Sequence, residues 1–172
     1  NLVQAAPKKW PDWKAQIARM RERVELERTP AGQDALAIKT GRGGLMDAEF
    51  LAQAACLESG WPEPNTLRAL LRMQAAKVLP PDPAEKLLAS YRELRRIESI
   101  LRRWSFEGEA VLPTDPAAFK RVSIRCGFAS PDHFRSAVAE WRENLRQAYS
   151  QYFAAARSPQ PPSGKTLKGL RR

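Results

Sequence analysis

The chain has 172 residues, with 29 Lys and Arg against 19 Asp and Glu, which gives a formal net charge of +10. This length is sufficient for one domain with a hydrophobic core, and the absence of an apolar run of about 20 residues argues against a membrane span. The basic excess favours polyanionic partners: nucleotide phosphates, nucleic acid or an acidic protein face. Because the chain begins at Asn1 without Met, we expect it to be a fragment or a processed product.

Apolar residues recur at helical spacing along most of the chain and predict an all-α fold, a helical bundle of about six helices. The predicted helices cover residues 12–28, 46–59, 65–78, 83–104, 116–126 and 131–156. Met20 and Leu71 are predicted to face inward in the first and third of these. Asp82, Asp115 and Ser130 each precede a Pro and are predicted N-caps.

The composition divides the chain into an N-terminal extension over residues 1–10, a helical bundle domain over 11–157 and a disordered basic C-terminal tail over 158–172. The tail is rich in Pro, Ser and Gly and has no core-forming pattern; the sequence leaves open whether it is natural. Cys56 and Cys126 lie inside helical patterns, so we expect two buried thiols rather than a disulfide. A single His and no Cys-x-x-Cys argue against a zinc site.

The most informative segment is a glycine-rich turn that leads into the second predicted helix, Lys39-Thr40-Gly41-Arg42-Gly43-Gly44. Glycines allow a positive φ and a close approach of the backbone to another surface. A helix N-terminus also favours anions such as phosphate. The turn lacks the Gly-Lys-Ser/Thr of a Walker A loop and the GxGxxG of a dinucleotide site.

This segment resembles the K-x-G-x-G-G-[LI]-x-D-x-E-F-x-x-Q signature of the glutamine synthetase adenylyltransferases, which the PII uridylyltransferases share in a related form. The matching residues are Lys39, Gly41, Gly43, Gly44, Asp47, Glu49, Phe50 and Gln53. Residues 17–23, 91–98, 112–113 and 126–128 resemble further landmarks of the family, so the resemblance covers roughly residues 10 to 155. The sequence departs from the family pattern at Met46, near Ser99 and over Glu109-Ala110-Val111, which bears on any activity that needs the missing polar groups.

The resemblance implies a helical domain that follows a nucleotidyltransferase domain. The enzyme it implies uses ATP and Mg²⁺ to transfer AMP to a Tyr of glutamine synthetase, or removes that AMP, in the cytoplasm. Glutamine synthetase, the chain's own nucleotidyltransferase domain and a PII-type regulatory protein are the implied partners. Enzymes of this family have two such halves, one that adds AMP and one that removes it. The resemblance favours the half that adds AMP, without deciding between the two.

The family's Gly-Ser turn and Asp-x-Asp pair are missing from this chain. Asp47 and Glu49 have the same spacing as the Asp-x-Asp pair, but they lie on a predicted helix. Residues i and i+2 of a helix point about 200° apart and cannot jointly hold one ion. We therefore predict no catalytic residue and no metal site in this fragment, and no nucleotide transfer by the isolated chain.

The candidate site residues face the phosphates or the active site. Lys39 and Arg42 are predicted phosphate-facing cations, Gly43 and Gly44 give the close backbone approach, and Asp47 or Glu49 holds a cation or orients a neighbour. The structural alternative is that Asp47 caps the helix while Glu49 pairs with an Arg of the first helix.

Other clusters have two interpretations. One interpretation of the clustered arginines is a solvated helix face on which they pair with Glu22, Glu27 and Glu98, and the other is a docking face for a partner. These arginines are at positions 19, 21, 23, 92, 95, 96, 102 and 103. Trp10 and Trp61 lie at loop edges, as interface anchors do. Alternative functions are therefore a non-catalytic basic module that binds nucleic acid or an acidic protein, and a degenerate paralogue that only scaffolds.

Overall fold

The structure is a computed structural model that describes residues 11–103 and 110–155. The N-terminal extension, Trp10, Glu109 and the predicted disordered tail lie outside the described residues. Within the described ranges the chain forms six α-helices and one 3₁₀ turn, so the predicted all-α bundle is confirmed. The elements are α2 (Trp13–Arg28), η1 (Asp34–Leu36), α3 (Leu45–Ser59), α4 (Thr66–Ala75), α5 (Pro81–Arg102), α6 (Pro116–Arg125) and α7 (Pro131–Ala155).

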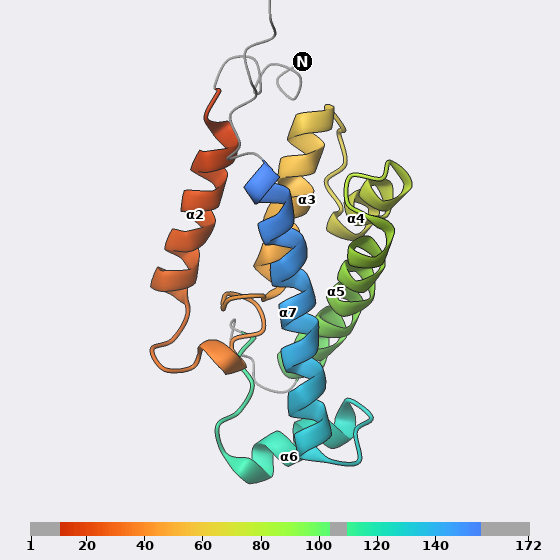
Figure 1. Ribbon diagram of the computed structural model, residues 1–172. Helices are drawn as coiled ribbons and strands as arrows, with labels where there is room; N and C mark the ends of the chain where they lie inside the picture. Colours follow the sequence, from red (N-terminus) through yellow and green to blue (C-terminus); the bar gives the residue numbers. More distant parts are fainter. Residues whose placement is uncertain (1–10, 104–109, 156–172) are drawn as a thin grey trace, which may run out of the picture.

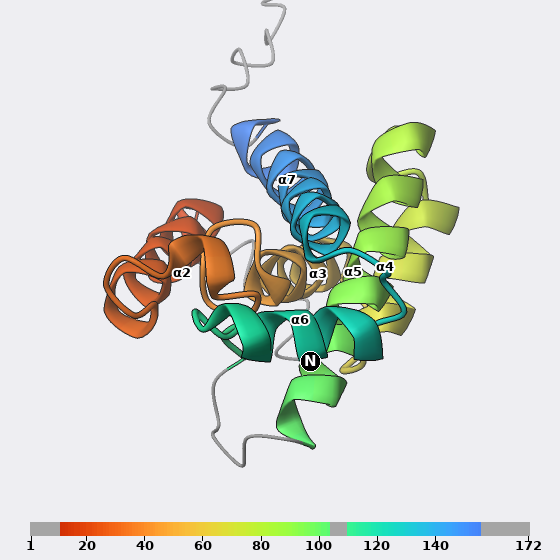
Figure 2. The same cartoon turned by 90° about the horizontal axis from the view of Figure 1, so that it is seen from below.

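The helices are arranged around the long pair α5 and α7, which pack along each other, with α3 against both (Figure 1). Helix α2 covers one side of α3, and α4 lies between α3 and α5 on the other side. Seen from below, α6 lies across one end of the bundle beside the start of α7 (Figure 2). This arrangement leaves the glycine turn, which joins η1 to α3, between α2 and α7.

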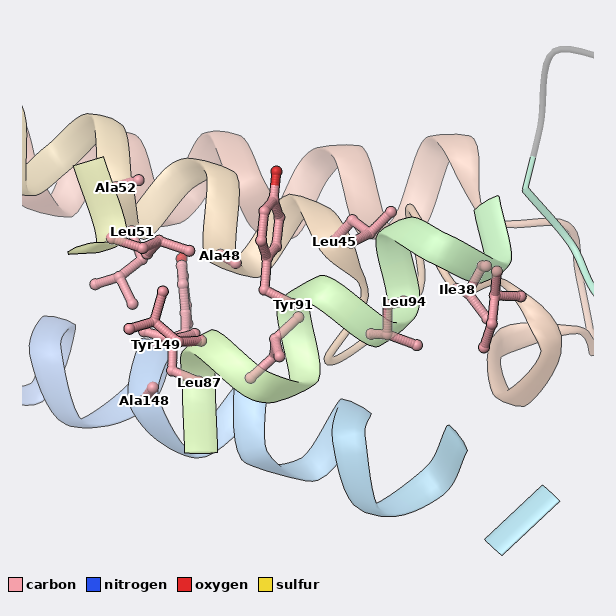
Figure 3. Packing of buried hydrophobic residues seen from close by; sticks show 14 of the residues in the cluster. Ile38, Leu45, Ala48, Leu51, Ala52, Leu87, Tyr91, Leu94, Ala148 and Tyr149 are labelled. Atoms are coloured by element: carbon pink, nitrogen blue, oxygen red, sulfur yellow. The ribbon is translucent and has the colours of Figure 1, made fainter. Parts of the chain in front are cut away.

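The core forms where α3, α5 and α7 meet (Figure 3). Small residues of α3, among them Ala48, Ala52 and Ala55, are almost fully buried and let the neighbouring helices approach closely. Larger side chains such as Leu87 and Leu94 of α5 fill the space between the helices. Full burial of one such Leu stabilises the fold by roughly 1.5–3 kcal/mol.

The ends of several helices agree with local capping signals. The Asp115 carboxylate accepts a hydrogen bond from the Ala118 N–H at 2.8 Å, and the Ser130 hydroxyl accepts one from the Asp132 N–H at 3.2 Å. Gly60 ends α3 with a φ of +67°. The prediction of Asp82 as an N-cap is wrong. Helix α5 begins at Pro81, the residue before Asp82, so Asp82 lies in the first turn of the helix.

Two predicted inward positions are also wrong. Met20 is 57% exposed and Leu71 is 40% exposed. In α2 the buried positions are Ala18 and Arg21, because the helix turns a narrow face with small and polar residues towards α3. Cys56 and Cys126 are free and buried, as predicted. Among the described helices, none has both the length and the apolarity needed to cross a bilayer.

Candidate functional site

The glycine turn is a tightly hydrogen-bonded connection that ends in α3. The Gly41 N–H donates to the Ala37 carbonyl at 3.1 Å, and the Gly44 N–H donates to the Gly41 carbonyl at 2.9 Å. Leu45 bonds back to the Ile38 carbonyl at 2.9 Å, so the turn closes on the residues that precede it. Lys39 therefore lies on a rigid support.

The glycines of this turn are required by contacts within the protein. A Cβ added at Gly43, whose φ is +72°, would lie 2.2 Å from the Arg142 carbonyl oxygen of α7. A Cβ added at Gly44 would lie 2.5 Å from the Lys39 carbonyl oxygen. Both glycines are buried, and the close backbone approach of Gly43 is made to α7.

Asp47 lies at the centre of a buried ion-pair network. Its side chain is fully buried, and one carboxylate oxygen accepts from Arg21 Nε of α2 at 2.6 Å. The other oxygen accepts from the Gly43 N–H at 3.0 Å and from Arg146 Nη1 of α7 at 3.3 Å. Asp47 thus joins the start of α3 to α2 and α7. Asp47 does not act as the N-cap, because Gly44 occupies that position without a side-chain cap and Asp47 accepts instead from Gly43, the residue before it. Asp47 does pair with an Arg of the first helix, a role that the structural alternative had given to Glu49.

Arg142 provides a second connection between α7 and the turn, through hydrogen bonds of its side chain. Its Nη2 donates to the Arg42 carbonyl at 2.5 Å and to Asp34 Oδ2 at 3.3 Å. Burial lowers the pKa of Arg142, and the neighbouring Asp34 carboxylate opposes this effect. The Arg42 N–H in turn donates to Asp34 Oδ1 at 2.8 Å. The backbone of Arg42 is therefore fixed, while its side chain is exposed.

Lys39 lies on the side of the turn opposite to Arg42, and its side chain reaches towards α5. Its Nζ is 3.5 Å from Glu98 Oε1, and Arg102 Nη2 is 3.1 Å from the same oxygen. Arg95 pairs with the second Glu98 oxygen. The Glu98 side chain is only 2% exposed, whereas these three cations are 29–55% exposed. Three partly accessible cations therefore surround one buried carboxylate.

Glu49 lies beside this cation cluster. Burial raises the pKa of Glu49, and the charges of Lys39 and Arg95 oppose this rise. The side chain lines a groove of about 540 Å³ between the start of α4 and α5, together with Tyr91 and Arg95. Asp47 and Glu49 thus face different neighbours, as their spacing on one helix predicts.

The predicted site residues are divided among three hollows. Lys39 lines a hollow of about 360 Å³ next to α2, Arg42 lines a cleft of about 270 Å³ beside α6 and α7, and Glu49 lines the groove already described. The Lys39 hollow also contains Met46, Ala110 and Val111, three of the positions at which the sequence departs from the family signature. Its wall at these positions is apolar.

The described residues form no group of three or more His, Cys, Asp or Glu side chains placed to hold a metal ion. Asp47 is surrounded by two arginines and a backbone N–H, and these donors already occupy both of its carboxylate oxygens. Asp47 therefore does not fit as a ligand of Mg²⁺.

Sequence reasoning missed Arg142 and Arg146, which hold the turn and the start of α3. It named Arg21 and Glu98 only as members of solvated ion pairs, and not as residues that position the turn and its cations. The interpretation of Arg21 as a solvated residue is wrong, because it is fully buried. For Arg142 the sequence does contain a signal that could have identified it as buried. Arg142 falls on the apolar stripe of its helix, four residues after Val138 and three before Leu145. A charged residue on an inward stripe predicts a buried ion pair.

The pairings predicted for the exposed arginines are confirmed in part. Arg23 lies 3.2 Å from Glu27, and both Arg95 and Arg102 pair with Glu98. Trp61 is half-buried, and the Arg72 guanidinium lies over its ring at 4.7 Å.

The family model described as GlnD PII-uridylyltransferase matches residues 12–153, which is most of the chain. The chain belongs to this family. It is similar to proteins named bifunctional glutamine synthetase adenylyltransferase/adenylyl-removing enzyme. The relative from Bordetella pertussis is 35% identical over 124 residues, covering 69% of this chain and 13% of the relative. The relative from Nitrosococcus oceani is 33% identical over 123 residues, with the same two coverages.

A third relative of that name, from Chromobacterium violaceum, is 30% identical over 152 residues, covering 85% of this chain and 17% of the relative. The resemblance seen in the glycine signature is thus confirmed over most of the domain. The chain spans between 13% and 17% of the length of these three curated relatives.

Proposed function

We propose that this chain is the helical accessory part of a glutamine synthetase adenylyltransferase. It acts beside a nucleotidyltransferase domain that transfers AMP from ATP to a Tyr of glutamine synthetase, or removes that AMP. The observation that carries the proposal is the family match over residues 12–153, in a chain that spans 13% of two relatives bearing that name.

In this proposal the cation cluster of Lys39, Arg95 and Arg102 faces the nucleotide phosphates. Transfer of a phosphoryl-type group depends mostly on positioning and on neutralising charge. The cluster carries three positive charges around the single Glu98 carboxylate, and Lys39 is held by a rigid turn. Glu49 orients Lys39 and Arg95, while Asp47 holds the turn in place through Arg21.

ATP and Mg²⁺ belong in this proposal to the full enzyme. Asp47 does not fit as a metal ligand, so we assign no step through Mg²⁺ to residues of this chain. We propose glutamine synthetase as the partner, with a PII-type protein as regulator and the cytoplasm as the location.

A segment exchange tests the proposal. Residues 12–153 of this chain replace the matching segment of the Bordetella pertussis relative, and AMP incorporation into glutamine synthetase is measured. We expect an active chimera, and no AMP transfer by the isolated chain. A folded but inactive chimera, or transfer by the isolated chain, contradicts the proposal.

Within the chimera, Lys39→Ala tests the cation cluster. We expect a loss of about tenfold or more in kcat, because a charge placed against the transferring group is removed. Lys86→Ala is the matched control, since Lys86 also pairs with a carboxylate, Asp82 at 2.9 Å, but lies at the far end of α5. Equal activity of the two variants would remove Lys39 from the site.

The alternative of a nucleic-acid module makes a separate prediction. Binding to DNA through several phosphates weakens steeply between low and moderate salt. Many cations of the described surface, Arg23 and Arg96 among them, already pair with carboxylates, which reduces their availability for a nucleic-acid backbone. Strong salt-sensitive DNA binding by the isolated chain would favour this alternative.

A further inference from the structure

The Arg42 cleft differs from the Lys39 cluster in position and in chemistry. It is lined by residues of η1, of α6 and mainly of the N-terminal half of α7. Its floor is apolar and contains Leu36, Leu112, Phe119 and Val138. Its volume of about 270 Å³ is just below the range usual for ligand clefts, so it suits a small molecule.

Four arginines line this cleft, and they fall into two pairs. Arg142 and Arg146 are held by carboxylates, the first by Asp34 and the second by Glu25 and Asp47. Arg42 and Arg135 are exposed, and neither forms an ion pair within the described part of the chain. Two guanidinium groups therefore remain available to a ligand.

The surroundings of Arg135 indicate the kind of ligand. Its guanidinium lies 4.4 Å from the centroid of the Phe119 ring, so one face stacks on an aromatic side chain. The Phe119 ring is itself fixed by Phe134, with ring centroids 5.4 Å apart. A guanidinium held flat in this way presents a planar cation, against which a second aromatic ring stacks.

Charge indicates the anionic group. A phosphate monoester carries close to two negative charges at pH 7, which matches the two available arginines better than one carboxylate does. Arginine also forms bidentate hydrogen bonds to phosphate oxygens. The backbone of Arg42 is fixed by Asp34 and Arg142, which limits the cost of ordering its side chain on binding.

We propose that the Arg42 cleft binds a small aromatic phosphate ester. Arg42 and Arg135 hold the phosphate, and the aromatic body lies on the apolar floor and against the guanidinium of Arg135. The site is separate from the Lys39 cluster and does not depend on the proposed enzymatic role.

The test is an NMR and calorimetric titration of the 172-residue chain with AMP, which joins an aromatic ring to a phosphate. We expect saturable binding with a Kd on the order of 1 mM or tighter, and shifts of the amides around Arg42, Phe119 and Val138. Adenosine and inorganic phosphate, which each supply half of the ligand, are expected to bind at least about tenfold more weakly.

Variants locate the site. Arg42→Ala and Arg135→Ala are each expected to weaken AMP binding about tenfold or more, because each removes a charge-assisted contact. Arg135→Lys, which keeps the charge but not the planar group, is expected to fall between wild type and Arg135→Ala. Arg19→Ala removes an exposed arginine of α2 outside the cleft and is expected to bind as wild type.

Three outcomes overturn the proposal. The first is that AMP shows no saturable binding, and the second is that the Arg42→Ala and Arg135→Ala variants bind AMP as tightly as Arg19→Ala does. The third is that AMP shifts only the amide signals of Lys39 and Arg95. In the last case Lys39→Ala abolishes binding, which assigns the nucleotide to the other cluster. Failure of the cleft and failure of the proposed enzymatic role are therefore distinguishable.

Discussion

Asp47 and Arg21 form an ion pair in which both side chains are fully buried. Burial of two charges is expensive, and it is tolerated here because each makes further contacts: Asp47 with Gly43 and Arg146, and Arg21 with the Gly41 carbonyl. The pair therefore fixes the turn at both ends. Its role is structural, and it supports the residues that are accessible to a ligand.

Asp47→Asn is expected to lower the free energy of unfolding by roughly 3–5 kcal/mol, because it leaves the buried Arg21 with only the more distant, partly exposed Glu25 carboxylate, 3.6 Å away, as counter-charge. Urea unfolding followed by circular dichroism measures this. Glu27→Gln is the control, since it breaks the exposed pair with Arg23 and is expected to cost below about 1 kcal/mol. Similar losses in both variants would contradict a buried, energetically coupled pair.

Gly43→Ala tests the contact between the turn and α7. The added methyl group would lie 2.2 Å from the Arg142 carbonyl oxygen, so the turn has to move. Gly32 has nearly the same φ, +73°, but nothing within 4 Å of its added Cβ. Gly32→Ala is therefore expected to cost only the left-handed strain of roughly 1–2 kcal/mol, and Gly43→Ala clearly more. Equal losses, measured by urea unfolding, would show that packing against α7 is unimportant.

At the level of the elements, α7 connects most parts of the fold. Its N-terminal half lines the Arg42 cleft, its middle holds the glycine turn through Arg142 and Arg146, and its C-terminal turns carry an aromatic cluster. In that cluster the Tyr149 and Phe153 rings lie 4.5 Å apart. The Tyr152 hydroxyl donates to Glu58 of α3 at 2.6 Å.

The tyrosines of α5 and α7 give the packing of these helices a pH-dependent contribution to stability. Burial raises the pKa of Tyr149 to about 12, with the nearby Asp47 adding to the rise, and burial also raises the pKa of Tyr91 and Tyr152. In the unfolded chain a Tyr ionises near pH 10, so above that pH the unfolded state loses its proton first. The contribution of Tyr149 is therefore complete below about pH 10 and is lost as the pH rises towards 12.

Tyrosinate absorbance tests this expectation. All three tyrosines of the chain are affected, so the folded chain is expected to show little ionisation at pH 10, while the chain in urea titrates near that value. Urea unfolding at pH 9 and pH 11 is expected to show lower stability at the higher pH. A folded chain whose tyrosines titrate at pH 10 would contradict their burial.

At the scale of the whole molecule, the glycine turn is connected to the core more firmly than most loops are. Helix α2 reaches it through Arg21, α7 through Arg142 and Arg146, and the Ala110–Leu112 segment through hydrogen bonds to Leu36 and Ile38. Lys39 and Arg42 are thereby held on opposite sides of one rigid support.

Native-state hydrogen exchange tests this rigidity. Loops ordinarily open locally with small free energies. We expect the amides of Gly41, Gly44 and Leu45 instead to exchange with a free energy close to that of global unfolding, which is also the value expected for the amide of the fully buried core residue Leu94. In Arg21→Ala, protection at the turn is expected to fall with the loss of its buried donor. Turn amides that exchange as fast as exposed loops would show that these contacts are not cooperative.

The helices, most of their ends and the family follow from the amino-acid sequence alone. Periodicity, Pro and capping residues act within one or two helical turns, so the all-α fold and the caps at Asp115 and Ser130 could be read locally. The position of the glycine turn was equally evident, since its residues are contiguous.

The contacts of the turn, in contrast, depend on how the helices pack in three dimensions. Arg21 and Asp47 are 26 residues apart in the chain, and Arg142 and Arg42 are 100 apart, so no local pattern pairs them. The same long-range packing turned Met20 outward and placed Lys39, Arg42 and Glu49 in three different hollows. The physical reason is that a helical pattern fixes which residues share a face, whereas the helix packed against that face determines which of them are buried and which charges meet.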